Sequence, residues 1–184
     1  VVAIDNQPGT AISCKTYVEE GLSVITENEE IDLIRQTTLE LLHANHTQDC
    51  TNCNQNNQCE LQKVTSFVGI NEARYARMRK TRPYIEVDDS NPFFNLDHNK
   101  CIMCGICVRT CDEIQGVNAL SYANRGFETV ISTFGNKPIK ESVCESCGEC
   151  VVRCPVGALY PKKSQVPTFE VKTVCTYCGV GCNI

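Results

Sequence analysis

The chain is poor in the residues that build a conventional core. It has no tryptophan, and aromatic residues make up only 7% of its 184 positions. No apolar stretch approaches the roughly 18 residues that a spanning helix needs, and no charged-then-apolar leader opens the sequence. These absences predict a soluble protein without a membrane anchor of its own. They also predict that bound metal replaces part of the missing apolar packing.

The charge balance is mildly acidic, with a formal net charge of −5. An acidic chain is a poor partner for nucleic acid. A short basic run departs from this balance, and we interpret it as a solvated face. A docking edge for an acidic partner, or a set of donors that tunes a metal site, is the alternative. The run consists of Arg74, Arg77, Arg79, Lys80 and Arg82.

Fifteen cysteines are the most informative feature of the sequence. Such a density serves either a disulfide framework or a set of metal sites. Disulfide-dense chains are usually shorter than about 80 residues and carry a secretory signal. The length of this chain therefore favours metal sites, and with them a cytoplasmic location.

The remaining sequence predicts short elements of both kinds, in an α+β fold of small modules stapled by metal clusters. Residues 1–25 predict short strands and turns. A helix is expected over 26–45, where Thr26 and Glu29 fit a capping box. Further predictions are a helix and a linker within 60–95, a strand over 127–134 and a polar linker over 164–174.

Two cysteine runs, at 101–111 and 144–154, share the spacing C-x2-C-x2-C-x3-C. Three closely spaced thiolates can hold one iron–sulfur cube, and in paired runs the fourth cysteine ligates the other cluster. One 4Fe-4S cluster is therefore expected on Cys101, Cys104, Cys107 and Cys154. A second is expected on Cys144, Cys147, Cys150 and Cys111.

The repeat resembles a two-cluster bacterial ferredoxin domain. Pro155 follows the last cysteine as it does in that family, whereas Asp112 takes the corresponding place after the first run. Zinc and disulfides are the alternatives. Zinc sites usually pair two C-x2-C units across a longer gap, which this spacing does not match.

A third constellation is His46-x3-Cys50-x2-Cys53-x5-Cys59, followed by the sequence ELQ. Zinc also accepts three cysteines and one histidine, so it stays an alternative here. The string resembles the one-histidine cluster motif of the large iron–sulfur subunit of respiratory complex I. The resemblance implies a third 4Fe-4S cluster, with His46 as a ligand. The other histidines are expected on a helix surface, for His43, and in a solvated loop, for His98.

The last cysteines lie towards the two ends of the chain. By itself, Cys14 indicates a buried free thiol. In the complex I family, however, a plant-type 2Fe-2S domain comes before the histidine motif, and Cys14 fits its last ligand position. The string Cys175-x2-Cys178-x3-Cys182 resembles the first cluster loop of molybdopterin oxidoreductases. These resemblances imply partial ligand sets for one 2Fe-2S and one further 4Fe-4S cluster.

The order of these motifs resembles the N-terminal iron–sulfur region of cytosolic, NAD-linked formate dehydrogenase alpha subunits, in the molybdopterin oxidoreductase family. The resemblance implies an electron-transfer module without a catalytic residue of its own. It would connect a molybdenum or tungsten pterin beyond the chain to a flavin- and NADH-binding subunit with a small 2Fe-2S subunit, or to ferredoxin. A module of an iron-only hydrogenase or of a complex I-like NADH oxidoreductase is the alternative, and a zinc-stapled interaction protein is a third possibility.

This resemblance divides the chain into four parts. They are the C-terminal remnant of a plant-type 2Fe-2S domain (1–25), a histidine-ligated iron–sulfur domain with its linker (26–95), a two-cluster ferredoxin domain (96–164) and the start of a molybdopterin oxidoreductase domain (165–184).

Overall fold

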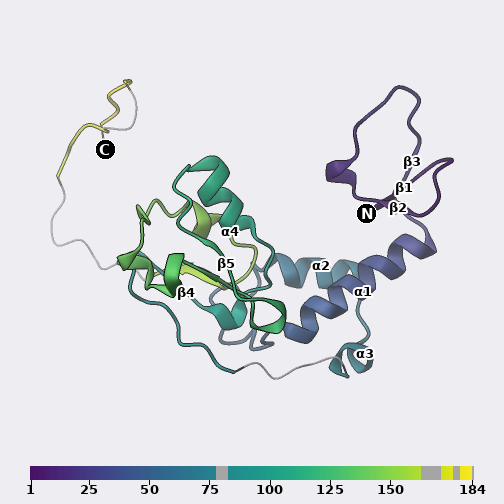
Figure 1. Cartoon of the computed structure of the whole chain (residues 1–184), viewed down its shortest axis with the longest axis horizontal. Helices are drawn as coiled ribbons and strands as arrows, with labels where there is room; N and C mark the ends of the chain where they lie inside the picture. The colour runs from purple at the N-terminus through teal and green to yellow at the C-terminus, as the bar shows by residue number, and fades with distance from the viewer. Residues whose placement is uncertain (78–82, 163–170, 176–178, 184) are drawn as a thin grey trace.

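The structure is a computed structural model that describes residues 1–77, 83–162, 171–175 and 179–183. Short helices and short strands are mixed along the chain (Figure 1), which confirms the predicted α+β class. Among the described residues, no helix combines the length and the apolar character that crossing a membrane requires.

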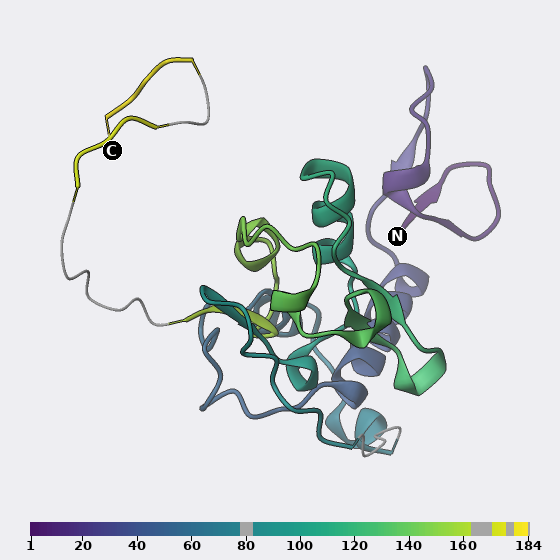
Figure 2. The same ribbon diagram turned by 60° about the vertical axis from the view of Figure 1, so that its left-hand side comes forward.

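A small antiparallel sheet lies beyond the N-terminal end of the first helix (Figures 1 and 2). Its central strand pairs with the other two, so the strand order is β2-β1-β3. The predicted turn between β1 and β2 contains Asn6 and Gly9, both at positive φ, a conformation that these residue types tolerate. The strands are β1 (Val2–Ile4), β2 (Thr10–Ala11) and β3 (Val24–Ile25).

The longest helix, α1 (Glu29–Asn45), begins three residues later than predicted. The side chain of Asn28 accepts a hydrogen bond from Ile31 N at 2.8 Å and caps the helix. The carbonyl of Thr26, the expected cap, instead accepts a bond from Arg35 at 2.8 Å. The capping box was therefore a wrong prediction, because Asn28 stands closer to the first helical turn. The buried face of α1 consists of Ile31, Leu39, Glu40 and Ala44.

Two shorter helices, α2 (Glu60–Val68) and α3 (Glu72–Ala76), pack against α1 (Figure 1). The α3 helix is fastened by Glu40, whose side chain is fully buried. Glu40 Oε1 accepts a bond from Asn71 N at 3.1 Å, and Glu40 Oε2 lies 3.2 Å from Arg74 Nε.

The basic run is therefore not simply a solvated face. Arg74 forms the ion pair with Glu40 and donates a hydrogen bond to Thr37 Oγ1 at 3.1 Å. Its charge compensates a buried carboxylate, which would be costly to leave unpaired. Arg79, Lys80 and Arg82 lie outside the described residues.

A ferredoxin-like lobe contains the two cysteine runs. The strand that precedes the first run pairs with the strand that follows the second, and the two strands between the runs pair with each other. All these pairs are antiparallel. The strands are β4 (Phe94–Leu96), β5 (Ser121–Ala123), β6 (Val130–Ser132) and β7 (Leu159–Pro161), and the helices are α4 (Ile106–Arg109) and α5 (Glu149–Val152).

The strand predicted over 127–134 is shorter than expected. Only β6 is extended, and 3-10 turns flank it at η4 (Gly126–Glu128) and η5 (Phe134–Asn136). Further 3-10 turns are η1 (Ser13–Lys15), η2 (His98–Lys100) and η6 (Ile139–Glu141).

Two apolar clusters hold the lobe together and join it to the helices. The first fills the lobe and contains Phe94, Leu96, Leu120, Ile131, Ile139, Cys150 and Leu159. The second joins residues of α1 and of the start of α2 to the segment after the second run, and contains Leu39, Cys59, Leu61, Val156 and Ala158. The helices consequently lie along one side of the lobe (Figures 1 and 2).

Candidate iron–sulfur sites

The two cysteine runs fold into loops with the same backbone geometry. In the first loop, Met103 and Gly105 adopt positive φ angles of 58° and 70°. The equivalent residues of the second loop, Ser146 and Gly148, adopt 59° and 79°. In each loop the amide two residues after the first cysteine lies 3.4 Å from that cysteine's sulfur and donates to it. Such amides are the donors that tune a cluster held by the loop.

The fourth cysteine of the first run faces the second loop. Cys111 lies in a π-helical turn, η3 (Thr110–Ile114), and its sulfur accepts a bond from Ala119 N at 3.2 Å. An apolar cavity is lined by Cys111 together with Cys144, Cys147 and Cys150. The structure therefore brings together the four cysteines predicted for the second cluster.

The fourth cysteine of the second run, Cys154, lies beside the first loop. Burial, together with the neighbouring Cys101, Cys154, Cys104 and Cys150, raises the pKa of the Cys107 thiol to about 12. Burial also raises the pKa of Cys154, although backbone hydrogen bonds oppose that shift. These cysteines are therefore close together, and they would bind as thiolates only with compensation by a metal.

The second site has matching electrostatics. Burial, together with the smaller effects of Cys144, Cys147 and Cys111, raises the pKa of Cys150 to about 12. The partners of Cys150 are thus the same cysteines that line the apolar cavity. Both four-cysteine groups follow the crossed pattern expected from the spacing.

The histidine constellation forms a separate site between α1 and α2. His46 follows the last residue of α1, and Cys59 is the N-cap of α2. One cavity is lined by His46, Cys50, Cys53 and Cys59. His46 Nδ1 is buried and has no hydrogen-bond partner. Burial lowers the pKa of His46 to about 4, so its ring is neutral and suited to bind a metal.

The ferredoxin-like lobe completes a wall of the histidine site. Gly157 follows the second run, and a Cβ atom built on it would lie 2.5 Å from Cys53 Sγ. Only glycine allows this approach. Glu60 N, next to Cys59, donates to the carbonyl of Pro155 at 3.0 Å. The histidine site therefore depends on contacts with residues nearly a hundred positions away.

His43 is not the surface residue that we expected. Its side chain is half-buried, and Nε2 lies 2.6 Å from Thr65 Oγ1. Its ring is 5.7 Å from that of Tyr75, and Gln48 Nε2 approaches Nδ1 at 3.5 Å. Burial lowers the pKa of His43. Both ring nitrogens face protein groups, whereas His46 Nδ1 does not, so His46 is the better candidate ligand.

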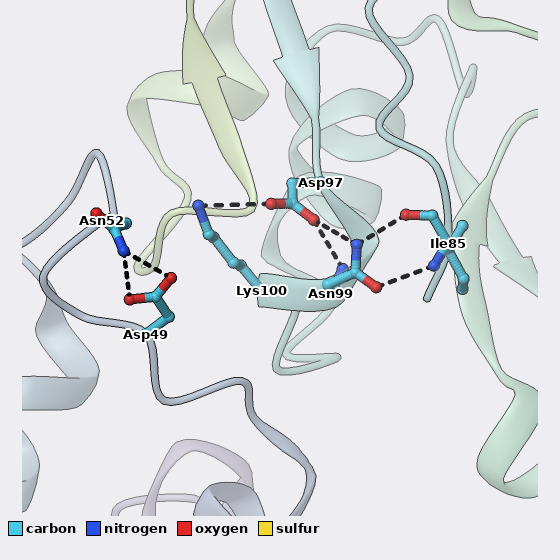
Figure 3. Close-up of polar contacts among 6 residues, drawn as sticks. All are labelled: Asp49, Asn52, Ile85, Asp97, Asn99 and Lys100. Carbon is cyan, nitrogen blue, oxygen red and sulfur yellow. Dashed lines mark hydrogen bonds and ion pairs between the residues drawn. The ribbon is translucent and has the colours of Figure 1, made fainter. Parts of the chain in front are cut away.

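A polar network joins the histidine site to the entry of the first cysteine run (Figure 3). Lys100, which lines the histidine-site cavity, lies 3.5 Å from Asp97 Oδ2. Asp97 Oδ1 accepts bonds from Asn99, whose side-chain amide also binds both backbone groups of Ile85. In Figure 3 the amino group of Lys100 lies between Asp97 and the loop of Asp49.

His98 also differs from the prediction of a solvated loop residue. It belongs to the 3-10 turn η2 and is half-buried. Its charge, when present, lowers the pKa of Asp88. His98 thus takes part in the packing of the turn that leads into the first run.

Three of the four cysteines near the ends of the chain, Cys14, Cys175 and Cys182, belong to the described residues. Cys14 is exposed in η1, so it is not the buried thiol that this residue by itself indicated. Cys175 and Cys182 close one loop, because Cys175 N donates to Cys182 O at 2.8 Å. Val174 and Asn183 form a β-bridge at the base of this loop. Cys178 lies outside the described residues.

The residues present fit iron–sulfur clusters by their chemistry. Each ferredoxin-type site groups four cysteines, and backbone amides donate to the sulfurs of Cys101, Cys144 and Cys111. The histidine site adds an orphaned, buried imidazole nitrogen and a glycine that makes room beside Cys53. In the described part of the chain, no group of three His, Cys, Asp or Glu residues is arranged around a single metal ion.

Sequence reasoning missed the residues that line these sites without being candidate ligands. Gly157 lies three positions beyond Cys154, and Lys100 stands directly before Cys101. Both act on the histidine site from another part of the chain, and nothing local distinguishes Lys100. For Gly157, its place after the string CPV was the one available signal.

Two family models match the chain. Residues 35–74 match the NADH-ubiquinone oxidoreductase-G iron-sulfur binding region. Residues 91–160 match the ferredoxin-like domain of NADH-quinone oxidoreductase subunit 3. The matches cover the histidine site and the paired cysteine runs, while the four-part division of the chain stays a prediction.

The relatives of this chain include several oxidoreductases and oxidoreductase subunits. The alpha subunit of an NADPH-Fe(3+) oxidoreductase of Geobacter sulfurreducens is 35% identical over 97% of this chain and 21% of the relative. A proposed formate dehydrogenase of Staphylococcus haemolyticus is 31% identical over 93% of this chain and 21% of the relative. The chain thus spans about a fifth of the length of these relatives.

A solved structure shares the fold. The crystal structure of an NAD+-reducing [NiFe]-hydrogenase in the H2-reduced state matches with a TM-score of 0.74 and 28% identity. The match covers 86% of this chain and 66% of the hydrogenase chain. The arrangement of helices and ferredoxin-like lobe is therefore one that also occurs in an NAD+-reducing [NiFe]-hydrogenase.

Proposed function

We propose that this chain, an iron–sulfur electron-transfer module of the NADH-quinone oxidoreductase G type, conducts electrons within a formate dehydrogenase complex. The observation that carries the electron-transfer role is the crossed grouping of two cysteine runs beside a histidine-containing site. Clusters held at these sites would accept and release single electrons at potentials that the surrounding protein sets.

Three complete sites would each hold a 4Fe-4S cluster. One uses Cys101, Cys104, Cys107 and Cys154, another uses Cys144, Cys147, Cys150 and Cys111, and the third uses His46, Cys50, Cys53 and Cys59. Cys14 would complete a 2Fe-2S site, and Cys175, Cys178 and Cys182 a further 4Fe-4S site, with ligands from elsewhere. These assignments rest on the cysteine spacing and on the grouping of the side chains.

The histidine site and the first ferredoxin-type site are neighbours in space. Cys59 belongs to the apolar cluster against which Cys101 and Cys154 also pack. A hydrogen bond of 3.0 Å from Glu60 N to Pro155 O connects the backbone of the two sites. One ligand of the histidine site thus shares its packing with two ligands of the other site, which favours electron exchange between them.

Formate is the proposed substrate of the whole complex, and the chemistry would occur at a molybdenum or tungsten pterin beyond this chain. The support is the loop that Cys175 and Cys182 close, which has the spacing of a molybdopterin oxidoreductase, together with the Staphylococcus relative. Partners would be a flavin- and NADH-binding subunit and a small 2Fe-2S subunit, or ferredoxin, in a cytoplasmic hetero-oligomer. The complex is an oxidoreductase, in which this chain would transfer electrons and would contribute no catalytic residue.

A second candidate is the same module in a hydrogenase or a complex I-like NADH oxidoreductase. The similarity to the NAD+-reducing hydrogenase favours it. The two candidates differ only in the catalytic partner, because the module itself would act in the same way in both.

Elemental analysis of the purified complex tests these proposals. We expect iron and labile sulfide for at least three 4Fe-4S clusters per chain, with molybdenum or tungsten alongside. The same iron without either metal, combined with hydrogen-dependent dye reduction, would replace formate dehydrogenase by hydrogenase. Zinc without labile sulfide would overturn the electron-transfer role and leave a zinc-stapled interaction protein.

A further inference from the structure

The two loops of the ferredoxin-like lobe form an internal comparison, because their backbones match while their charges do not. Where the first loop has Ile102, the second has Glu145. Where the first has Arg109, the second has Val152. The difference places an added positive charge on one loop and an added negative charge on the other.

Arg109 is held against the first loop. Its Nη2 donates to the carbonyl of Cys104 at 3.4 Å, and its Nη1 lies 3.2 Å from the position of a Cβ on Gly105. Tyr122 covers the same place, since its hydroxyl donates to Met103 O at 3.4 Å and would overlap that Cβ. The guanidinium therefore lies beside the backbone that joins two candidate ligands.

The second loop has no such cover. A Cβ on Gly148 would meet nothing within 4 Å, and Val152 is 84% exposed. Glu145 lines the cavity of the second site. Glu149, a further acid of this loop, is compensated by Arg153 at 3.2 Å. The uncompensated difference between the loops is thus Arg109 on one side and Glu145 on the other.

Desolvation does not separate the two sites. Burial raises the pKa of Cys107 and that of Cys150 alike to about 12. Cys147 is more exposed than Cys104, but Cys150 is more buried than Cys107. With loop backbone and burial nearly matched, charge is a variable that can set the potentials of the two clusters apart.

We infer that Arg109 and Glu145 give the two sites unequal reduction potentials, and that the site of the first loop is the easier to reduce. Reduction adds one electron, with no bond formed and no proton required. A nearby positive charge stabilises the reduced, more negative state, whereas a nearby negative charge destabilises it. The inference rests on the proposed function, because it requires a cluster at both sites.

The test is a redox titration of the intact complex, followed by electron paramagnetic resonance with dithionite as the reductant. Loss of a signal in Cys107→Ser or in Cys150→Ser identifies the two sites. In Arg109→Val and Glu145→Ile, each loop receives the residue of the other. We expect Arg109→Val to lower the midpoint potential of the first site and Glu145→Ile to raise that of the second. The double variant should bring the two potentials together.

Two controls separate charge from structure. Arg109→Lys keeps the charge and should keep the order of the potentials, whereas Lys63→Gln removes an exposed charge outside both loops and should move neither. Both Arg109 and Glu145 are exposed, so their effects should shrink at high ionic strength.

The outcomes distinguish this inference from the function on which it rests. If the wild-type complex shows no 4Fe-4S signals, the proposed function fails and the inference fails with it. If the signals appear but neither substitution moves a potential, or both move the same one, the inference is overturned while the proposed function stands.

Discussion

The ferredoxin-like lobe and the histidine site bring their candidate ligands together in different ways. The lobe groups its cysteines through a repeat, in which each run supplies three residues to one site and one to the other. The histidine site takes all its candidate ligands from residues 46–59, but Lys100 and Gly157 of the lobe line it. The sites of the lobe therefore depend on each other, whereas the histidine site depends on the lobe.

Because of this difference, a substitution at one site should affect another site. Loss of one fourth cysteine should affect the site opposite its own run. Loss of packing at the lobe should reach the histidine site, because Cys59 and Cys154 share one apolar cluster. The following changes test these dependencies, from the largest effect to the smallest.

The crossed ligands give the largest expected effect. Cys111→Ser should remove roughly one 4Fe-4S cluster per chain, and the lost signal should be the one that Cys150→Ser also removes. Cys107→Ser should remove the other signal. Iron content and electron paramagnetic resonance spectra measure both. If Cys111→Ser and Cys107→Ser abolish the same signal, each run holds its own cluster and the crossing is wrong.

The ion pair between Arg74 and the buried Glu40 should have the next largest effect. Arg74→Met leaves the carboxylate of Glu40 buried without its cation, which should cost about 3 kcal/mol of the free energy of unfolding, the low end of the range for buried pairs because Arg74 is partly exposed. Urea unfolding under anaerobic conditions measures it.

The exposed pair of Lys63 and Glu60, at 2.6 Å, is the matched control. Lys63→Met should cost less than about 1 kcal/mol, because solvent screens both partners. Equal costs for the two substitutions would mean that Glu40 does not depend on Arg74.

The contact between the lobe and the histidine site gives a smaller effect. Gly157→Ala introduces a methyl group 2.5 Å from Cys53 Sγ. We expect a loss of about 1–3 kcal/mol through overpacking and an altered spectrum of the histidine site, with the signals of the lobe retained.

Gly179→Ala is the control, since a Cβ there meets nothing within 4 Å. An unchanged histidine-site spectrum in Gly157→Ala would show that the lobe does not shape that site.

The smallest effect concerns the linker that leads into the lobe. Burial tends to raise the pKa of Asp88, but hydrogen bonds from Ser90 and Ile139 outweigh it, so the pKa lies below its usual value. This stabilisation is present at neutral pH and is lost as the pH falls below 3.8 and through the pKa of the folded state. Asp88→Asn should cost less than about 1 kcal/mol at pH 7.

Urea unfolding under anaerobic conditions at pH 7, where iron–sulfur clusters keep their acid-labile sulfide, measures this cost. Asp89→Asn, at the exposed neighbouring residue, should have little effect. Equal costs for the two substitutions would exclude the hydrogen bonds of the Asp88 carboxylate as the source.

The sequence predicted the class of fold and the grouping of the paired cysteines. That Cys111 and Cys154 are ligands of the opposite clusters stays a prediction from the spacing; the structure places each of them beside the other run. The sequence-based prediction failed at the start of α1, because several polar residues precede that helix. Asn28, and not Thr26, caps the helix. The prediction also failed for His43, whose partners Thr65 and Tyr75 belong to other helices.

The sequence alone determined which side chains are candidate ligands, because three cysteines within one short loop can converge whatever surrounds them. What surrounds those atoms was decided only by the tertiary structure. The approach of Gly157 to Cys53 joins segments far apart in the chain, and Tyr122 covers the first loop from the strand β5. Such contacts form when the apolar clusters pack the helices against the lobe, and no local pattern encodes them.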